Sequence, residues 1–117
     1  MTAERAHEDY LRDILEHAEK AQGFLAATPS VEELRKDERT LFAVIRALEV
    51  IGGAAKRIPE DLRQQHPEVP WRGMTGMRDK VTHGYFGVDA EVVWRTVRED
   101  LPPLRKAISA LVPDGTQ

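Results

Sequence analysis

Residues 41–58 read LFAVIRALEVIGGAAKRI, and this stretch decides the fold class. Its apolar side chains recur three or four positions apart, the spacing of one helix face; the set is Leu41, Ile45, Leu48, Ile51, Ala55 and Ile58. Pro59 ends the pattern. Gly52 and Gly53 lie inside it, and each costs about 1 kcal/mol relative to alanine in a helix interior. The pair indicates close approach of another backbone, a bend, or simply a locally weak helix.

The residues before this stretch predict another helix and a short capped segment. Apolar residues again follow helical spacing up to Pro29, and they are Leu11, Ile14, Leu15, Ala18 and Leu25. Ser30 with Glu33 three positions later forms a capping-box pattern, which predicts a helix start. Asp37 is a candidate cap for a second start.

The residues after it predict a loop and two further helices. Residues 64–70 contain Pro67 and Pro70 and are expected to form the loop. A third helix follows, with Trp71, Met74, Met77 and Val81 on one face and Gly84 as its closing residue. Asp89 is expected to cap a fourth helix, which Pro102 and Pro103 must kink or restart; its buried side is Val93, Val97, Leu101, Leu104, Ile108 and Leu111.

Four amphipathic segments and no alternating strand pattern predict an all-α fold. The links between them are short, so we expect an antiparallel four-helix bundle with short connecting helical turns. The chain has 117 residues, which suggests one domain over residues 1–117.

Composition excludes several classes of protein. The chain has no cysteine, which rules out disulfides, zinc–thiolate sites and a cysteine nucleophile. No apolar run approaches the ~20 residues that span a bilayer, and residues 1–19 are charged rather than signal-like. We therefore expect a cytoplasmic protein that is not inserted in a membrane.

The charge balance argues against a strongly basic nucleic-acid binder, because the net charge is −3. Residues 71–85 are nevertheless locally positive, since Arg72, Arg78 and Lys80 stand against Asp79 alone. No metal site is expected: the only Glu-x-x-His is Glu4 with His7, whereas a di-iron bundle needs two such motifs.

Residues 78–85 read RDKVTHGY and are the densest candidate for chemistry. They combine a fixed cation, an imidazole that titrates near neutrality and a phenol. On one straight helix His83 would lie roughly 140° around from Arg78, so the two cannot share a face. Either the helix ends before His83 or a second subunit supplies the missing half. The plainer interpretation, favoured by composition alone, is a helix end with ordinary surface charges.

The spacing of Arg78, His83 and Tyr85 resembles the Arg-x4-His-x-Tyr motif of the HepT-like toxins, which are HEPN-domain ribonucleases. Further landmarks of that family follow in its order, from about Asp9 to Leu111; they are residues 48–52 (LEVIG), 67–71 (PEVPW), 76–78 (GMR), 83–86 (HGYF), 93–94 (VW) and 100–102 (DLP). Two positions depart from the family's usual pattern. Asp79 stands where asparagine is usual, and Gly53 where an acidic residue is common.

The resemblance implies a HEPN-like bundle and a metal-independent RNA endonuclease toxin that needs no cofactor. In such enzymes His83 would transfer a proton and Arg78 would stabilise the phosphorane. Arg72 and Lys80 are candidate phosphate-binding residues, and Asp79 is a candidate modulator of Arg78.

The resemblance also implies partners. Two motifs would meet at the cleft of a homodimer, which would remove the 140° difficulty. A cognate nucleotidyltransferase antitoxin of the MntA type would transfer AMP to Tyr85, which otherwise would simply pack beside Phe86.

Two other functions remain open at this point. The protein could be a non-catalytic helical accessory subunit that presents substrate or nucleotide to a nucleotidyltransferase, which Asp79 favours. It could also be a helical interaction module in which the motif is a relic. An RNA-cleavage assay with and without EDTA separates the enzyme from both.

Overall fold

A computed structural model describes residues 3–77, 79 and 89–113. In these residues every regular element is helical, which confirms the all-α prediction. The long helices are α1 (Ala3–Ala26) and α3 (Glu38–Lys56), and a third column consists of α7 (Ala90–Arg95), the π-helix η1 (Thr96–Asp100) and α8 (Leu101–Ser109). The shorter helices are α2 (Val31–Lys36), α4 (Glu60–Gln65) and α5 (Trp71–Thr75).

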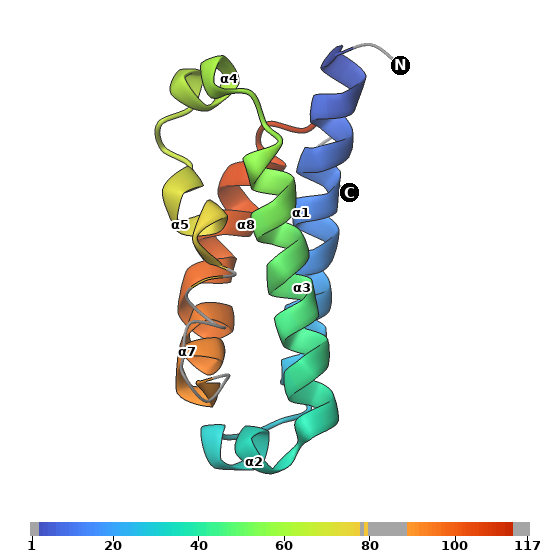
Figure 1. The fold of residues 1–117 in the computed structure, drawn as a ribbon, viewed down its shortest axis with the longest axis vertical. Helices are drawn as coiled ribbons and strands as arrows, with labels where there is room; N and C mark the ends of the chain where they lie inside the picture. The colour runs from blue at the N-terminus through green and yellow to red at the C-terminus, as the bar shows by residue number, and fades with distance from the viewer. Residues whose placement is uncertain (1–2, 78, 80–88, 114–117) are drawn as a thin grey trace.

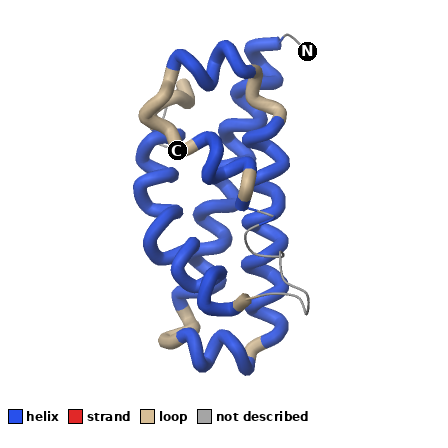
Figure 2. The backbone as a smooth tube through the Cα atoms, turned by 60° about the vertical axis from the view of Figure 1, so that its left-hand side comes forward, coloured by secondary structure: helices blue, strands red, loops and turns tan. Residues whose placement is uncertain are grey.

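The helices form an elongated bundle measuring 43 × 31 × 26 Å. Figure 1 shows α1 and α3 side by side along the long axis, with α2 across one end and α4 at the other. The column of α7, η1 and α8 completes the bundle, with α5 beside α3, and Figure 2 shows the same arrangement from another side. Helices α1 and α3 run in opposite directions, whereas the column of α7, η1 and α8 runs in the same direction as α3.

The predicted apolar faces form one core. The fully buried side chains come from all three columns and from α5, and they include Ile14, Leu25, Leu48, Ile51, Met74, Leu101, Leu104 and Ile108. At about 25 cal/mol per Å² of buried apolar surface, such burial is the main force that holds the helices together. Leu15, Leu41 and Leu111 from the predicted faces are only partly buried at the edge of this core.

The predicted caps are present. Ser30 Oγ accepts a hydrogen bond from the Glu33 amide at 3.1 Å, and Asp37 Oδ1 accepts one from the Thr40 amide at 3.1 Å. Asp89 Oδ1 accepts bonds from the amides of Glu91 and Val92 at 3.0 and 3.3 Å. Each bond satisfies an amide that the first helical turn leaves without a partner.

Two predictions about helix boundaries need correction. Residues 64 and 65 belong to α4 and not to the loop, because Pro59 and two acidic residues, Glu60 and Asp61, favour a helix start there. This helix has no fully buried residue and so shows no apolar periodicity in the sequence. The predicted third helix is not continuous, because α5 ends at Thr75 and Gly76 forms a turn before Met77. Helix α3, by contrast, continues through Gly52, which is buried, and Gly53, which is exposed.

The predicted break at Pro102 and Pro103 is confirmed in a specific form. The two prolines begin α8, and the turn before them is a π-helix. The Leu101 amide donates to the Thr96 carbonyl, five residues back instead of four. A wider turn accommodates prolines, which have no N–H and whose rings clash with the carbonyl four residues earlier.

In the described part of the chain, no helix is long and apolar enough to cross a membrane.

Candidate active site

Trp71 fixes the start of α5, the helix that leads to the motif. Its side chain is buried, and the indole Nε1 donates a hydrogen bond to the His66 carbonyl at 2.9 Å. The same carbonyl accepts the Val69 amide at 3.1 Å, and the Trp71 amide donates to the Val69 carbonyl at 2.8 Å. These bonds tie the proline-flanked loop to the first residue of the helix.

The helix buries one face and exposes the other. Trp71, Met74 and Met77 are buried, as the sequence predicted, whereas Arg72 is exposed. Met77 immediately precedes Arg78 in the sequence. The motif therefore begins directly after a residue whose side chain is buried in the core. The guanidinium of Arg72 is available to solvent at the same helix, as a phosphate-binding residue requires.

Gly76 makes the turn between α5 and Met77. Its amide donates to the Arg72 carbonyl at 3.0 Å, and a Cβ at this position would lie 3.3 Å from that same oxygen. The Thr75 hydroxyl also donates to the Arg72 carbonyl, at 3.1 Å. A side chain at position 76 would therefore press on a carbonyl that already accepts two bonds.

The structure places two of the six predicted site residues. Arg72 and Asp79 are both exposed, and Asp79 has a helical backbone. The other four, Arg78, Lys80, His83 and Tyr85, lie outside the described residues, as do Val81 and Gly84 of the predicted third helix. Their grouping remains a prediction.

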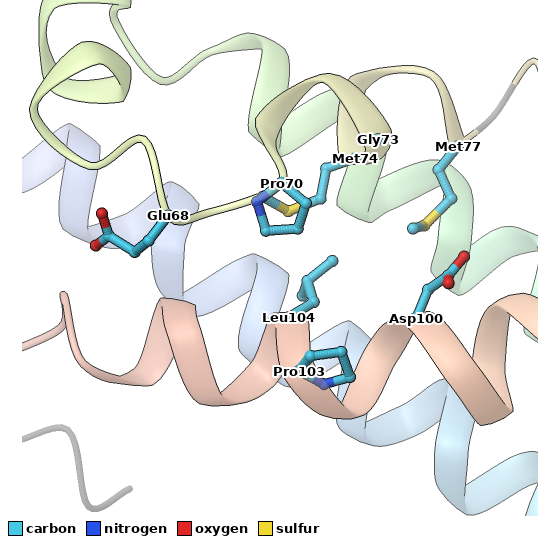
Figure 3. A pocket seen from close by; sticks show the side chains of 8 residues that line it. All are labelled: Glu68, Pro70, Gly73, Met74, Met77, Asp100, Pro103 and Leu104. Carbon is cyan, nitrogen blue, oxygen red and sulfur yellow. The ribbon is translucent and has the colours of Figure 1, made fainter.

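A pocket of about 470 Å³ lies between α5 and the column of η1 and α8. Figure 3 shows side chains from the two sides pointing toward one another. The lining residues are mainly apolar, with carboxylates from Glu68 and Asp100: Glu68, Pro70, Gly73, Met74, Met77, Asp100, Pro103 and Leu104. The pocket adjoins Met77, where the chain enters the motif.

Asp100 had no assigned role in the sequence, yet its carboxyl group faces Met77 across this pocket (Figure 3). Its position follows from the π-helix, which adds one residue to the turn that ends at Asp100. The signal for that turn was present, because two consecutive prolines predict an irregular turn before them.

Within the described residues, no group of three or more His, Cys, Asp and Glu side chains is placed to hold a metal ion.

Comparison with known proteins identifies relatives over almost the whole chain. Residues 14–111 match the family model described as "Ribonuclease HepT-like". The chain is 52% identical over 101 residues to "Probable ribonuclease HepT" of Thermococcus cleftensis, covering 86% of this chain and 91% of that protein. No solved structure gives a significant match.

More distant relatives carry similar names. One protein of Methanocaldococcus jannaschii, named "Putative RNase MJ1216", is 39% identical over 105 residues, covering 90% of this chain and 86% of its own length. "Putative RNase TTE0752" of Caldanaerobacter subterraneus is 36% identical over 107 residues, covering 88% of this chain and 91% of its own length.

Proposed function

Because this chain belongs to the family of HepT-like ribonucleases, we propose that it is a metal-independent RNA endonuclease toxin with Arg78 and His83 in its active site. The observation that carries the proposal is the family match over residues 14–111, which includes the entire motif. The anchoring of α5 through Trp71, Met74 and Met77 supports it, because it gives the motif a rigid starting point.

The proposed reaction needs two proton transfers and one stabilised anion. The ribose 2′-oxygen attacks the neighbouring phosphorus and gives up its proton to a base, while the 5′-oxygen leaves and takes a proton from an acid. His83 is suited to either transfer, because imidazole titrates near neutral pH. Arg78 remains charged and offers two parallel N–H donors to the phosphorane oxygens.

A homodimer would supply the second histidine that the reaction needs. Each motif contains one histidine, whereas the reaction uses a base and an acid at the same time. Two His83 side chains in a shared cleft would perform both roles, and two Arg78 side chains would double the positive charge at the phosphate. The exposed Arg72, together with Lys80, would extend this charge along the RNA backbone.

The proposed regulation acts on Tyr85. A cognate nucleotidyltransferase of the MntA type would attach AMP to its hydroxyl, two residues from His83 in the sequence. The attached nucleotide would add bulk and negative phosphate at the positive residues that bind RNA. This would close the site in the presence of the antitoxin.

One observation favours a second candidate function. The carboxylate of Asp79 is exposed and directly follows Arg78, where it opposes the binding of phosphate. A non-catalytic accessory subunit of a nucleotidyltransferase would tolerate this charge better than a ribonuclease would.

RNA cleavage by the purified protein in EDTA tests the proposal. Arg78→Ala and His83→Ala are expected to lower the rate by at least about 10²-fold, the usual contribution of a catalytic proton transfer. Lys20→Ala is the matched control, since Lys20 is a cation on the outer face of α1 that pairs only with Glu16 among described residues, at 2.9 Å. Cleavage at the wild-type rate by His83→Ala would contradict the assigned chemistry. No cleavage by the wild type would favour the accessory subunit.

A further inference from the structure

The pocket between α5 and the column of η1 and α8 has apolar walls and an apolar floor. Pro70 and Gly73 are exposed on the side of α5, and Pro103 is exposed on the side of α8. Met74 and Leu104 line the same pocket but are fully buried, so they form its floor. The volume of about 470 Å³ is within the range of pockets that hold small organic molecules.

Gly73 keeps the α5 side of this pocket open. It lies in the middle of α5, where glycine is less favourable than alanine. Its φ is not in the left-handed region, and a Cβ built there meets only Pro70 Cβ among described residues, at an ordinary 3.9 Å. The described part of the protomer therefore gives no packing reason for glycine, whereas a large side chain at position 73 would occupy the pocket.

The polar side chains of the described lining are two carboxylates. Asp100 faces Met77 at one end of the pocket, whereas the Glu68 carboxylate points away from the other lining side chains (Figure 3). Glu68 Oε2 lies 3.4 Å from His66 Nδ1. No cation is among the described lining residues, so the pocket repels a phosphate and attracts a group that donates hydrogen bonds.

This lining fits a flat ring whose faces are apolar and whose edge donates hydrogen bonds. Thioethers make favourable contacts with aromatic rings, and Met74 and Met77 both line the pocket. Proteins that read single-stranded RNA hold a splayed base by its faces and bond its Watson–Crick edge. Among the four RNA bases, only guanine presents two adjacent donors on this edge, N1–H and the N2 amino group. These donors match the two oxygens of a carboxylate.

We propose that the pocket binds an unpaired guanine, with the base between Pro70 and Pro103 and its two donors bonded to Asp100. A carboxylate offers about four acceptor positions, so Asp100 can accept these bonds in addition to the contacts that it already makes. Met77 lines the pocket and immediately precedes Arg78 in the sequence. The consequence for the substrate rests on the proposed function: the endonuclease cuts single-stranded RNA beside a guanosine.

Methionine methyl signals measure binding without any cleavage. The chain has three methionines, and two of them, Met74 and Met77, line the pocket. In protein labelled with carbon-13 at the methionine methyl groups, guanosine 5′-monophosphate is expected to shift both signals through the ring current of the base. Inosine 5′-monophosphate lacks only the N2 amino group and should bind about threefold more weakly, the usual effect of one hydrogen bond. Uridine 5′-monophosphate should bind more weakly still.

A larger residue at position 73 tests the location. Gly73→Leu is expected to raise the dissociation constant for guanosine 5′-monophosphate at least about tenfold, because the new side chain fills the space of the base. Helical content should not fall, since nothing described in the protomer opposes the substitution. Gly23→Leu is the matched control, because Gly23 is also an exposed helical glycine with nothing within 4 Å of an added Cβ.

The preference for guanine over hypoxanthine tests the role of Asp100. Asp100→Asn places an amide where two acceptors are needed, so the variant should bind the guanosine and inosine nucleotides equally. Glu68→Gln is the matched control within the same lining. It should keep the wild-type preference, because the Glu68 carboxylate points away from the proposed position of the base (Figure 3).

Three results would overturn the proposal: equal binding of the guanosine and uridine nucleotides by the wild type, unchanged affinity in Gly73→Leu, or methyl shifts caused by spermidine but not by guanosine 5′-monophosphate. The last result would assign the pocket to a cation. Mapping of the cut sites in an unstructured RNA separates these outcomes from a failure of the proposed function. Cleavage that requires His83 but shows no preference for guanosine would keep the ribonuclease and reject the pocket. Selective binding of guanosine 5′-monophosphate by a protein that cleaves no RNA would do the reverse.

Discussion

Trp71 illustrates what a single residue contributes to this protein. Its side chain is buried in the core, while its indole N–H donates a hydrogen bond to the His66 carbonyl in the preceding loop. Helical spacing predicted the burial of Trp71, Met74 and Met77. It could not predict the hydrogen bond, because the position of the His66 carbonyl depends on how the loop with Pro67 and Pro70 folds.

Asp79 is the residue where charge bears most directly on the proposed activity. Asp79→Asn is expected to raise kcat/KM for RNA up to about fivefold, because two exposed charges 4 Å apart interact by about 1 kcal/mol in water. RNA-cleavage kinetics at low ionic strength measure the effect, and added salt should reduce it.

Asp79→Glu is the control for this substitution, since it keeps the charge and should leave the rate near that of the wild type. A large loss of activity in Asp79→Asn would instead give the carboxylate a positive role in the reaction.

At the scale of the helices, Asp37 joins two elements. It ends α2 and begins α3, where its carboxylate accepts hydrogen bonds from the Thr40 hydroxyl at 2.6 Å and the Thr40 amide at 3.1 Å. These bonds, the hydroxyl bond first, lower the pKa of Asp37 below its ordinary value of 3.8. The folded state therefore favours the ionised carboxylate.

The sign of the resulting pH dependence follows from linkage. A group whose pKa is lowered by folding stabilises the protein above its unfolded pKa, and this stabilisation is lost as the pH falls through the folded pKa. We expect the free energy of unfolding of the wild type to fall more steeply below about pH 4 than that of Asp37→Asn. Urea denaturation between pH 2.5 and 6 measures the difference.

Asparagine keeps a side-chain oxygen for the cap but does not titrate, so Asp37→Asn isolates the charge from the hydrogen bonds. Parallel pH profiles of the two proteins would show that Asp37 contributes no pH-dependent stability.

The helix caps could be predicted from neighbouring residues, whereas the π-helix could not. The caps at Ser30, Asp37 and Asp89 were predictable because each depends on a few adjacent residues. The prolines at 102 and 103 predicted a break, but not that a π-helix would absorb it. The π-helix keeps Val97 and Leu101 buried on both sides of the break. Because their burial depends on the whole bundle, the local sequence could not predict it.

At the scale of the whole molecule, four amphipathic segments with short links were sufficient to predict an all-α bundle in which α1 and α3 run antiparallel. The apolar faces have few other ways to meet, since each link is too short to cross the bundle.

The last prediction concerns the regulation of the whole protein through Tyr85. The chain carries a net charge of −3, so its affinity for RNA must come from a local group of cations. In the proposed site, each attached AMP would add about one negative charge to the region of Arg72, Arg78 and Lys80. At contact distance and intermediate dielectric, one such pair is worth about 4 kcal/mol. This energy is sufficient for the modified tyrosine to compete with an RNA phosphate.

Intact mass after incubation with the cognate nucleotidyltransferase, ATP and Mg²⁺ measures the modification. The wild type should gain one or more adenylyl units and lose RNA cleavage, whereas Tyr85→Phe should gain none and stay active beside the antitoxin. The chain offers a matched control, because Tyr10 is its only other tyrosine. Tyr10 is half-buried on α1 with the Arg57 guanidinium 5.8 Å from its ring centroid, so Tyr10→Phe should be modified like the wild type. An unchanged mass in the wild type, or equal modification of Tyr85→Phe, would favour the accessory subunit, since Tyr85 would then have no part in switching a cleavage site.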